Sequence, residues 1–427
     1  MSAQTISLRE PIVITGIGAI ASTGHDRESL WQAVRRGESG VGRIRGVVGI
    51  PDDEMIGAMV DIPAPNNRLK QTLLVRHAGH EALQDASIDF DTVDRTRFAS
   101  SVSAVMADWK FRDAHDGYYD VTEQTAGEDV PWFHQWLPNT PAADAGEYFG
   151  LHGPRLAYST ACASGLIGVI NAVRAIRDDQ CDIALAGSGD SIDGLMAAGF
   201  QKMRALAHHD DPRQASRPFD SQRNGFVMGE GAAMFVVERL GHALARGAKI
   251  YAEIRSGKVL AEAHHVTGLD SSTESLSHLI DITLRGAKLE HADIGHINTH
   301  GTGTLQNDLA EMRAIRDSFG EGAKEICVAA NKSCLGHMVN AAGSMELALT
   351  VLALRDGFAP PTLNLTDPDP ECTFDAMPLV GKVNRFQHAL KLSVAFGGHL
   401  VAMALSRWND AATGFGYPDT DEYRKAA

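Results

Sequence analysis

Ser159-Thr160-Ala161-Cys162-Ala163-Ser164-Gly165 is a run of small residues that leads into residues 166–177, and this stretch indicates the fold class. Apolar residues then recur at the spacing of one helix face, namely Leu166, Ile170, Val173 and Ile176. The pattern places Cys162 at a junction between a strand and a helix. The dipole and free N–H groups of a helix start lower a thiol pKa from about 8.5, which favours the nucleophilic thiolate. A buried structural cysteine is the alternative interpretation.

Short apolar runs and helix-like periodic stretches alternate on both sides of this junction. The apolar runs cover residues 12–15, 183–186, 232–237, 296–300 and 392–396. Strands joined by crossover helices are typical of the α/β class, which we therefore predict. The halves before and after about residue 250 share the order strand, reactive residue, helix. An internal duplication would explain this order but is not proved by it.

A second candidate cluster, His300-Gly301-Thr302-Gly303-Thr304, ends one of the predicted strands. Its glycines would let backbone and hydroxyl donors approach a ligand while the imidazole faces a reaction centre. Asp308 and Glu311, three residues apart, predict that the next helix begins at Asp308. A histidine that is simply satisfied near a turn is the alternative for His300.

A third candidate cluster runs from Asn331 to His337 and precedes a long apolar helix that carries Glu346. Lys332 and His337 can converge across the glycine turn between them, and Glu346 can pair with the lysine. A solvated surface turn is the alternative interpretation.

Composition and charge exclude several classes of function. The 427 residues allow two or three lobes or one duplicated α/β unit. The 39 Lys and Arg residues against 54 Asp and Glu residues give a net charge of −15, which disfavours nucleic acid and membrane surfaces as partners. Five scattered cysteines indicate a reducing compartment. The N-terminus has no leader pattern and no apolar run reaches about 18 residues, so we predict a cytoplasmic protein.

Two motifs are weak signals for ligands. The run from Gly16 to Ala21 loosely matches a dinucleotide fingerprint, but the residues after Ala21 do not open as a helix, so we predict no nucleotide site. Cys327, Cys334 and His337 lack the paired spacing of a zinc site, so we predict no metal.

Taken together, the three clusters resemble the elongating β-ketoacyl-acyl-carrier-protein synthases, which are condensing enzymes of the thiolase fold. The resemblance runs from about residue 12 to residue 407 and is weak from about residue 45 to 135. Its motifs follow the family's order at residues 13–18, 160–162, 217–220, 225–231, 300–304, 332–337 and 396–399.

The resemblance implies a layered α-β-α-β-α core built from two similar halves and usually assembled as a homodimer, with a heterodimer as the alternative. Residues 1–250 would form the half that carries the nucleophilic cysteine, and residues 251–410 the half that carries two histidines. Residues 411–427 would form a flexible tail. Substrates would be carried on the phosphopantetheine of an acyl carrier protein, with no bound cofactor and no metal.

The resemblance also implies catalytic roles. Cys162 would take an acyl group from the carrier protein. His300 and His337 would hold the thioester carbonyl of a malonyl extender while it loses CO₂, and the resulting carbanion would attack the acyl-enzyme. Lys332 with Glu346 would order the two histidines.

Supporting roles follow from the same resemblance. Thr302 and Thr304 would hydrogen-bond the phosphopantetheine arm, and the backbone N–H groups of Cys162 and Phe396 would bind the acyl oxyanion. Acidic carrier proteins need local positive charge on this acidic chain. The candidate docking residues are Arg68, Lys70, Lys202, Arg204 and Arg213.

Two departures from the family leave finer questions open. Residues Val394–Leu400 lack one glycine and the asparagine of the family's Phe-Gly-Phe-Gly-Gly gating loop, which puts gating and chain-length selection in doubt. We predict a condensing enzyme of fatty-acid or related lipid biosynthesis. The alternatives are a type II polyketide ketosynthase with a partner subunit, which Gln306-Asn307-Asp308 slightly favours, and a non-condensing scaffold subunit. Acyl length, branching, extender and pathway stay open.

Overall fold

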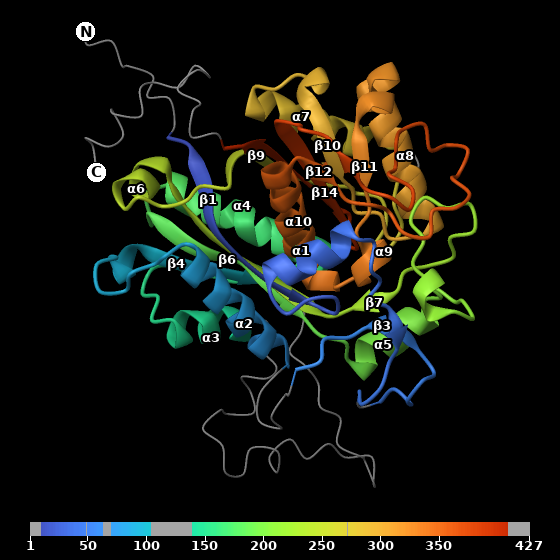
Figure 1. Ribbon diagram of the computed structural model, residues 1–427, viewed down its shortest axis with the longest axis horizontal. Helices are drawn as coiled ribbons and strands as arrows, with labels where there is room; N and C mark the ends of the chain where they lie inside the picture. Colours follow the sequence, from blue (N-terminus) through green and yellow to red (C-terminus); the bar gives the residue numbers. More distant parts are fainter. Residues whose placement is uncertain (1–9, 48, 63–69, 104–138, 271, 409–427) are drawn as a thin grey trace.

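A ten-stranded sheet runs through the computed structural model, which describes residues 10–47, 49–62, 70–103, 139–270 and 272–408 (Figure 1). The strands, in their order across the sheet, are β11 (Cys327–Ala329), β10 (Ile294–Asn298), β14 (His388–Ala395), β15 (His399–Arg407), β9 (Ala252–Ala261), β1 (Ile12–Ala21), β8 (Gly231–Arg239), β6 (Ile183–Asp190), β4 (Phe98–Ser103) and β5 (Arg155–Leu156). The two halves of the chain meet where β1 pairs antiparallel with β9, at Val13 opposite Glu253.

Helices form three layers around this sheet. The central pair, α4 (Ser164–Arg177) and α10 (Ala342–Asp356), pack against each other between the two halves of the sheet. The outer faces are covered by α2 (Lys70–Asp85) and α3 (Thr140–Tyr148) on one side and by α7 (Glu274–Ala287) and α8 (Leu305–Phe319) on the other (Figure 1). This arrangement confirms the predicted α/β fold with alternating helix and sheet layers.

The smaller elements lie around this core. They are helices α1 (Arg27–Arg35), α5 (Gly194–Lys202), α6 (Leu240–Ala245) and α9 (Lys332–Leu335), the strands β2 (Gly42–Arg43), β3 (Ile56–Ala58) and β7 (Met228–Gly229) of a three-stranded sheet, and the paired strands β12 (Phe358–Ala359) and β13 (Lys382–Val383). The predicted tail at 411–427 lies outside the described residues.

The glycines near the N-terminus serve helix packing. Strand β1 is buried along its whole length, and α2 lies directly against it. A Cβ atom on Gly18 would lie 1.9 Å from the carbonyl oxygen of Ala78, and one on Gly16 would lie 2.2 Å from that of Ala82. Only glycine permits so close an approach of helix and strand. Close packing of α2 on β1 therefore accounts for the glycines of the run from Gly16 to Ala21, and no nucleotide is needed to explain them.

Two predicted boundaries in the second half were wrong by a few residues. Strand β10 ends at Asn298, before His300, and helix α8 begins at Leu305, before Asp308. The reason is that Glu311 does not cap the helix. Its carboxylate accepts hydrogen bonds from the backbone N–H groups of His300 and Gly301, both at 2.6 Å, and so holds the preceding loop.

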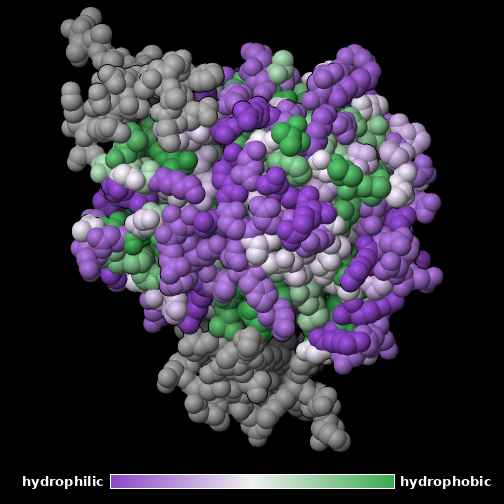
Figure 2. All heavy atoms as spheres, in the orientation of Figure 1, coloured by the Kyte–Doolittle hydropathy of each residue, from purple (hydrophilic) through white to green (hydrophobic). Residues whose placement is uncertain are grey.

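The visible surface is mainly hydrophilic, with small separate hydrophobic patches (Figure 2). Within the part of the chain that the structure describes, no helix combines the length and the apolar composition needed to cross a membrane.

His296, on β10, makes the stability of the fold depend on pH. Its side chain is fully buried, its Nδ1 donates a hydrogen bond to the Cys327 carbonyl at 2.8 Å, and its ring stacks on Phe386. Burial lowers the pKa of His296 to about 4. The unfolded chain therefore binds one more proton than the folded chain between about pH 4 and 6.5, so this histidine makes stability rise with pH across that window.

Replacing His296 by phenylalanine is expected to remove this contribution, which amounts to about 2 kcal/mol between pH 5 and 7. Urea unfolding followed by circular dichroism between about pH 5 and 7 measures the slope. The same replacement of exposed His208 is the control and should leave the slope unchanged. Equal slopes for wild type and His296→Phe would contradict the prediction.

Candidate active site

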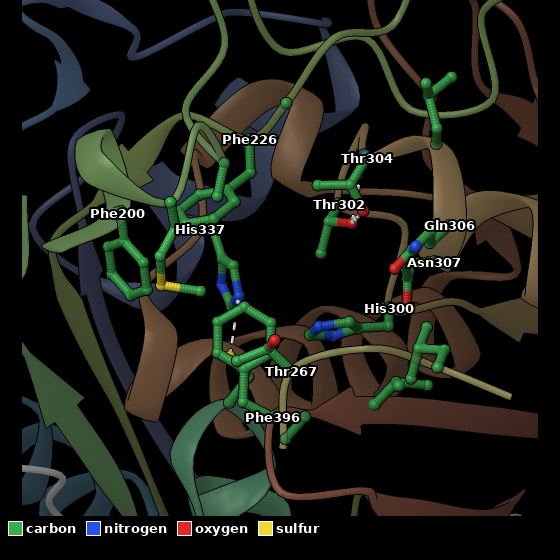
Figure 3. A pocket seen from close by; sticks show the side chains of 18 of the residues that line it. Phe200, Phe226, Thr267, His300, Thr302, Thr304, Gln306, Asn307, His337 and Phe396 are labelled. Atoms are coloured by element: carbon green, nitrogen blue, oxygen red, sulfur yellow. Dashed lines mark hydrogen bonds between the residues drawn. The ribbon is translucent and has the colours of Figure 1, made fainter. Parts of the chain in front are cut away.

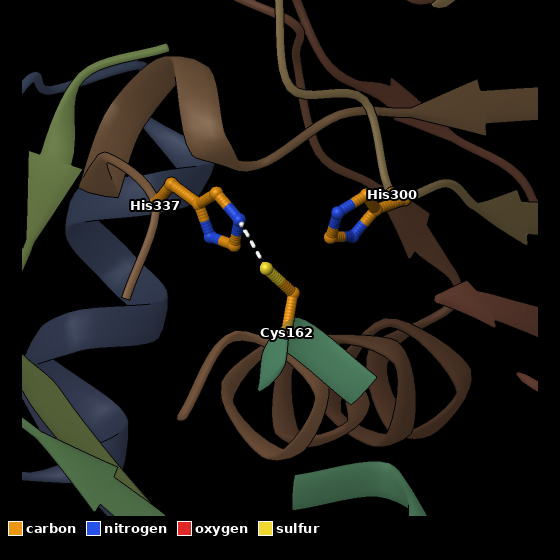
Figure 4. A group of neighbouring side chains, drawn as sticks. All are labelled: Cys162, His300 and His337. Carbon is orange, nitrogen blue, oxygen red and sulfur yellow. Dashed lines mark hydrogen bonds between the residues drawn. The ribbon is translucent and has the colours of Figure 1, made fainter. Parts of the chain in front are cut away.

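Three segments from different parts of the chain bring Cys162, His300 and His337 together (Figure 4). Cys162 lies in a 3-10 turn (Ala161–Ala163) that leads into α4, His300 lies in the loop after β10, and His337 follows α9. All three side chains are buried. The Cys162 Sγ lies 3.1 Å from Nε2 of His337, and the two imidazole rings meet edge to face with centroids 5.2 Å apart.

The thiol of Cys162 is neutral in the resting site. Burial raises its pKa to about 12, against the opposing effect of the Lys332 ammonium, and Asp190 and Glu346 add to the rise. The sequence-based expectation of a lowered thiol pKa was therefore wrong for this state. The reason is that desolvation of the charged thiolate outweighs the helix end and the nearby cation.

The hydrogen bonds of the two histidines fix their tautomers. The backbone N–H of Val339 donates to Nδ1 of His337 at 3.2 Å, and the Lys332 ammonium lies 3.1 Å from Nδ1 of His300. Since Nδ1 is the acceptor in both rings, each neutral imidazole carries its proton on Nε2. Both rings turn toward the thiol (Figure 4). The arrangement offers two N–H donors to a negatively charged oxygen between them.

Burial keeps both imidazoles neutral. It is the main cause that places the pKa values of His300 and His337 well below 6.5, and the charge of Lys332 lowers both further. Neutral imidazoles can donate N–H bonds without changing their protonation state.

The backbone next to His337 is strained. Val339 has φ +37°, a conformation that a β-branched residue rarely adopts. Such strain persists only where surrounding contacts enforce it, and it is concentrated at functional sites. Here it turns the N–H of Val339 toward the His337 ring.

Behind the histidines lies a buried cluster of Lys332, Glu346 and Lys391, which we name the lysine–glutamate cluster. Lys332 pairs with Oε1 of Glu346, as the sequence predicts, and also donates to the carbonyl oxygen of His300. Lys391, on β14, reaches Oε2 of the same carboxylate at 2.7 Å. Sequence reasoning missed Lys391. The available signal was a lysine inside an apolar strand, where both neighbours, Leu390 and Leu392, are buried.

A cavity of about 390 Å³ opens onto the three side chains (Figure 3). Thr302 and Thr304 line it, with their hydroxyl oxygens 2.8 Å apart, and Phe396 closes one side. Phe200 and Phe226 add aromatic surface, and their ring centroids lie 5.0 Å apart. A narrow site with hydroxyls on one wall and aromatic rings on another suits a long, mostly apolar substrate with a few polar groups.

The loop that departs from the family pattern is tied to a neighbouring segment. Gly397 and Gly398 have φ values of +85° and +76°. The Gly397 N–H donates to the Val266 carbonyl at 2.7 Å, and the Gly398 carbonyl accepts from the N–H of Glu262 at 2.8 Å. Leu400 lies in the hydrophobic core, so the position that holds asparagine in the family contributes packing here.

The five candidate docking residues differ in their exposure and in their ion pairs. Lys202, Arg204 and Arg213 are exposed, and Arg204 also lines the cavity. The ammonium of Lys70 pairs with the buried carboxylate of Glu230 at 2.5 Å, so its charge is used within the fold. Arg68 lies outside the described residues.

The three central side chains fit a metal ion poorly. Among the described residues they form a group whose ligand atoms lie within 4.8 Å of one another. Nδ1 of each ring accepts a hydrogen bond, so the Nε2 atoms that face the thiol carry protons and have no lone pair for a metal. The buried Lys332 ammonium, 3.1 Å from Nδ1 of His300, also disfavours a cation there.

Comparisons with known proteins match most of the chain to beta-ketoacyl synthases. Residues 9–243 match the family described as "Beta-ketoacyl synthase, N-terminal domain", and residues 251–366 match "Beta-ketoacyl synthase, C-terminal domain". The chain is 34% identical to the "Tetracenomycin polyketide synthase ketoacyl synthase alpha subunit" of Streptomyces glaucescens, over 93% of this chain and 97% of that protein. It is 31% identical to "3-oxoacyl-[acyl-carrier-protein] synthase 2" of Vibrio harveyi, over 91% and 96%.

A solved structure, "The ishigamide ketosynthase/chain length factor", superposes with a TM-score of 0.82 and 28% identity. The superposition covers 94% of this chain and 100% of the chain in that structure. The likeness therefore extends over both halves of the fold.

Proposed function

The chain belongs to the beta-ketoacyl synthase family of condensing acyltransferases, and from that premise we propose that it is the ketosynthase subunit of a type II polyketide-type system. The observation that carries the condensing chemistry is the thiol of Cys162 lying beside two imidazoles that both present Nε2–H. The 34% identity to a polyketide ketosynthase alpha subunit supports the polyketide branch. The sequence motifs predict the fatty-acid branch, but the comparisons support the polyketide alternative better.

In the proposed first half-reaction, the acyl thioester on the carrier protein exchanges with Cys162. The Cys162 sulfur forms a bond to the acyl carbonyl carbon, and the bond from that carbon to the phosphopantetheine sulfur breaks. The Cys162 proton ends on the departing phosphopantetheine thiol, so no net proton is gained or lost. Because burial keeps the resting thiol protonated, its proton has to leave as the sulfur attacks, and a bound thioester held in the right orientation lowers the barrier to that step.

In the proposed second half-reaction, malonyl carrier protein binds with its thioester oxygen between His300 and His337. The bond to the carboxylate carbon breaks, CO₂ leaves, and the electron pair remains as an enolate whose oxygen accepts the two Nε2–H bonds. The enolate carbon attacks the acyl carbonyl, and the Cys162 thiolate leaves and takes one proton from solvent. Donors that are already aimed and neutral need no reorganisation as the charge develops.

The hydroxyls of Thr302 and Thr304 support a role in substrate placement. They line the cavity beside His300 and bond to each other at 2.8 Å, so each has a hydrogen-bonding site left for an amide of the phosphopantetheine arm. The substrates are carried on an acyl carrier protein, and the reaction needs no other cofactor in the beta-ketoacyl synthase family.

Intact-mass spectrometry tests the proposal. The protein is incubated with a panel of acyl carrier proteins charged with short, long and branched acyl chains, and malonyl carrier protein is then added. We expect an acyl adduct that disappears as a β-ketoacyl carrier product forms. An adduct that persists would indicate a non-condensing subunit, and the absence of any adduct would refute the proposed function.

A partner subunit distinguishes the two branches. The structural neighbour that contains a chain length factor supports assembly with a second, related chain. The relative named 3-oxoacyl-[acyl-carrier-protein] synthase 2 supports the fatty-acid branch as the second candidate. Size-exclusion chromatography with light scattering, combined with the condensation assay, decides between them. A homodimer that condenses alone would favour the fatty-acid branch, and activity only with a co-expressed partner would favour the polyketide branch.

Carrier docking is expected to depend on Lys202 and Arg204. Lys202 lies in the last turn of α5, and exposed Arg204 lies at the cavity, where an acidic carrier must deliver its arm. We expect the double change to glutamate to raise the KM for carrier-bound substrates by about 3- to 10-fold, with a smaller effect at high salt. Steady-state kinetics measures this. Turnover of a short acyl-pantetheine should not change, and Lys324→Glu, outside the cavity lining, is the matched control.

A further inference from the structure

Lys391 is a fully buried lysine that the condensing chemistry described above does not use. It lies in the middle of β14, with Asn298 of β10 beside it on one side and Met403 of β15 on the other. Its ammonium meets three oxygens: Oε2 of Glu346 at 2.7 Å, the carbonyl of Thr299 at 3.1 Å and the carbonyl of Leu392. Desolvating an ammonium is costly, so a fold keeps such a group only where the contacts compensate.

We propose that Lys391 is a positioning residue that holds the His300 loop and keeps a net positive charge beneath the two histidines. This inference rests on the proposed condensing function and deepens it. Lys391 does not touch the reacting atoms and acts through Glu346 and the Thr299–His300 backbone.

The first argument is geometric. The carbonyl of Thr299 is held by Lys391 and that of His300 by Lys332, while the N–H groups of His300 and Gly301 are held by Glu311. Two lysine side chains thus hold the carbonyl groups of this loop, and the Glu311 carboxyl group holds its N–H groups. Removing Lys391 would leave the Thr299 carbonyl and one oxygen of Glu346 without a donor in a buried site, and the loop that aims His300 would relax.

The second argument is the charge balance. One carboxylate, that of Glu346, lies between the ammonium groups of Lys332 and Lys391. Burial lowers the pKa of Lys391 to about 8, so below that pH the lysine–glutamate cluster carries a net charge of +1 close to both imidazoles. That charge disfavours protonation of the histidines and favours an enolate between them. Lys391 contributes to the lowered pKa of both His300 and His337. Without Lys391 the cluster would be neutral.

Other titratable groups around the site do not supply this charge. Glu311 directs both oxygens to backbone N–H groups on the side of α8, and Asp190 of β6 accepts from the N–H of Asn340. Asp190 opposes a positive field, and burial raises the pKa of Glu311 to about 7, so Glu311 is only partly ionised near neutral pH and supplies no positive charge. Among the described residues, Lys332, Glu346 and Glu311 act on Lys391 or the histidines, Cys162 contacts His337, and Asp190 acts on Cys162.

The test compares wild type with Lys391→Met, in which the apolar part of the side chain remains. We expect acylation of Cys162 to change by less than about 3-fold, while kcat for condensation falls by about 10- to 100-fold with little change in KM. The acid limb of the kcat profile should also move to higher pH. Below the Lys391 pKa of about 8, wild type should stay level down through pH 6.5, and the variant should begin to lose activity at a higher pH than wild type as pH falls. Unchanged condensation and an unchanged profile would overturn the proposal.

Two further measurements separate positioning from general support of the fold. Lys391→Ala leaves a space lined by three oxygens, so added ammonium or ethylammonium should restore part of the condensation rate, and ethanol should not. Equal effects of ethylammonium and ethanol would overturn the role of the charge. Lys258→Met, on β9 two strands away in the same sheet, is the matched control and should show no shift in the pH profile.

Nuclear magnetic resonance of ¹⁵N-histidine-labelled protein gives a reading that needs no substrate. In wild type, His300 and His337 should remain neutral with the proton on Nε2 at pH values well below 6.5, and in the Lys391 variants they should protonate at higher pH than in wild type. Wild-type rings that protonate near pH 6.5 would refute the inference even if no variant folds. A wild-type protein that fails to condense but shows neutral rings would refute the proposed function and leave the charge balance supported.

Discussion

Cys162→Ala is expected to abolish acylation and to lower the condensation rate by at least about 1,000-fold. The sulfur is the atom that bonds to the acyl carbon, and no second thiol lies near: of the five cysteines, those other than Cys162 do not line the cavity. Loss of CO₂ from malonyl carrier protein needs only the two Nε2–H donors, so this partial reaction should persist. Intact-mass spectrometry and release of labelled CO₂ measure the two effects separately.

Cys372→Ala is the matched control for this change. Cys372 is partly exposed and lies in a different segment, so its loss removes a thiol without touching the site. We expect wild-type acylation and condensation. An acyl adduct on Cys162→Ala would show that another group takes the acyl chain and would contradict the assignment of the nucleophile.

The sequence predicted the main lines of the fold because apolar periodicity records which residues are buried. The runs at 12–15, 183–186 and 232–237 all fall within strands β1, β6 and β8. Boundaries near His300 were missed because Asp308 and Glu311, which have the spacing of a helix start, instead bind loop N–H groups. The spacing of residues in the sequence shows which residues are present, but it does not show the direction in which their carboxylates point.

The three candidate clusters were predicted from the sequence, and their convergence was not. Cys162, His300 and His337 come from three loops, and only the pairing of the strands in between brings these loops to one place. The thiol pKa depends on burial from all sides, which a local helix-start argument omits. Lys391 was missed for a related reason, because its partners Glu346 and Thr299 are distant in sequence.

His300→Ala and His337→Ala are expected to lower condensation by about 100- to 1,000-fold each, since each removes one donor from the enolate oxygen. The two changes should differ in the first half-reaction. His300→Ala should still form the acyl adduct at a rate close to wild type, whereas His337→Ala should slow acylation because His337 is the ring in contact with Sγ of Cys162. Single-turnover mass spectrometry separates acylation from condensation.

His337→Asn is the informative companion, because an asparagine side chain keeps an N–H donor at this position. It should retain more condensation than His337→Ala. The double alanine variant should lose less than the product of the single effects, since both rings serve one oxygen and act as a unit. Fully multiplicative losses would contradict a shared oxyanion, and would instead place the two histidines in separate steps of the reaction.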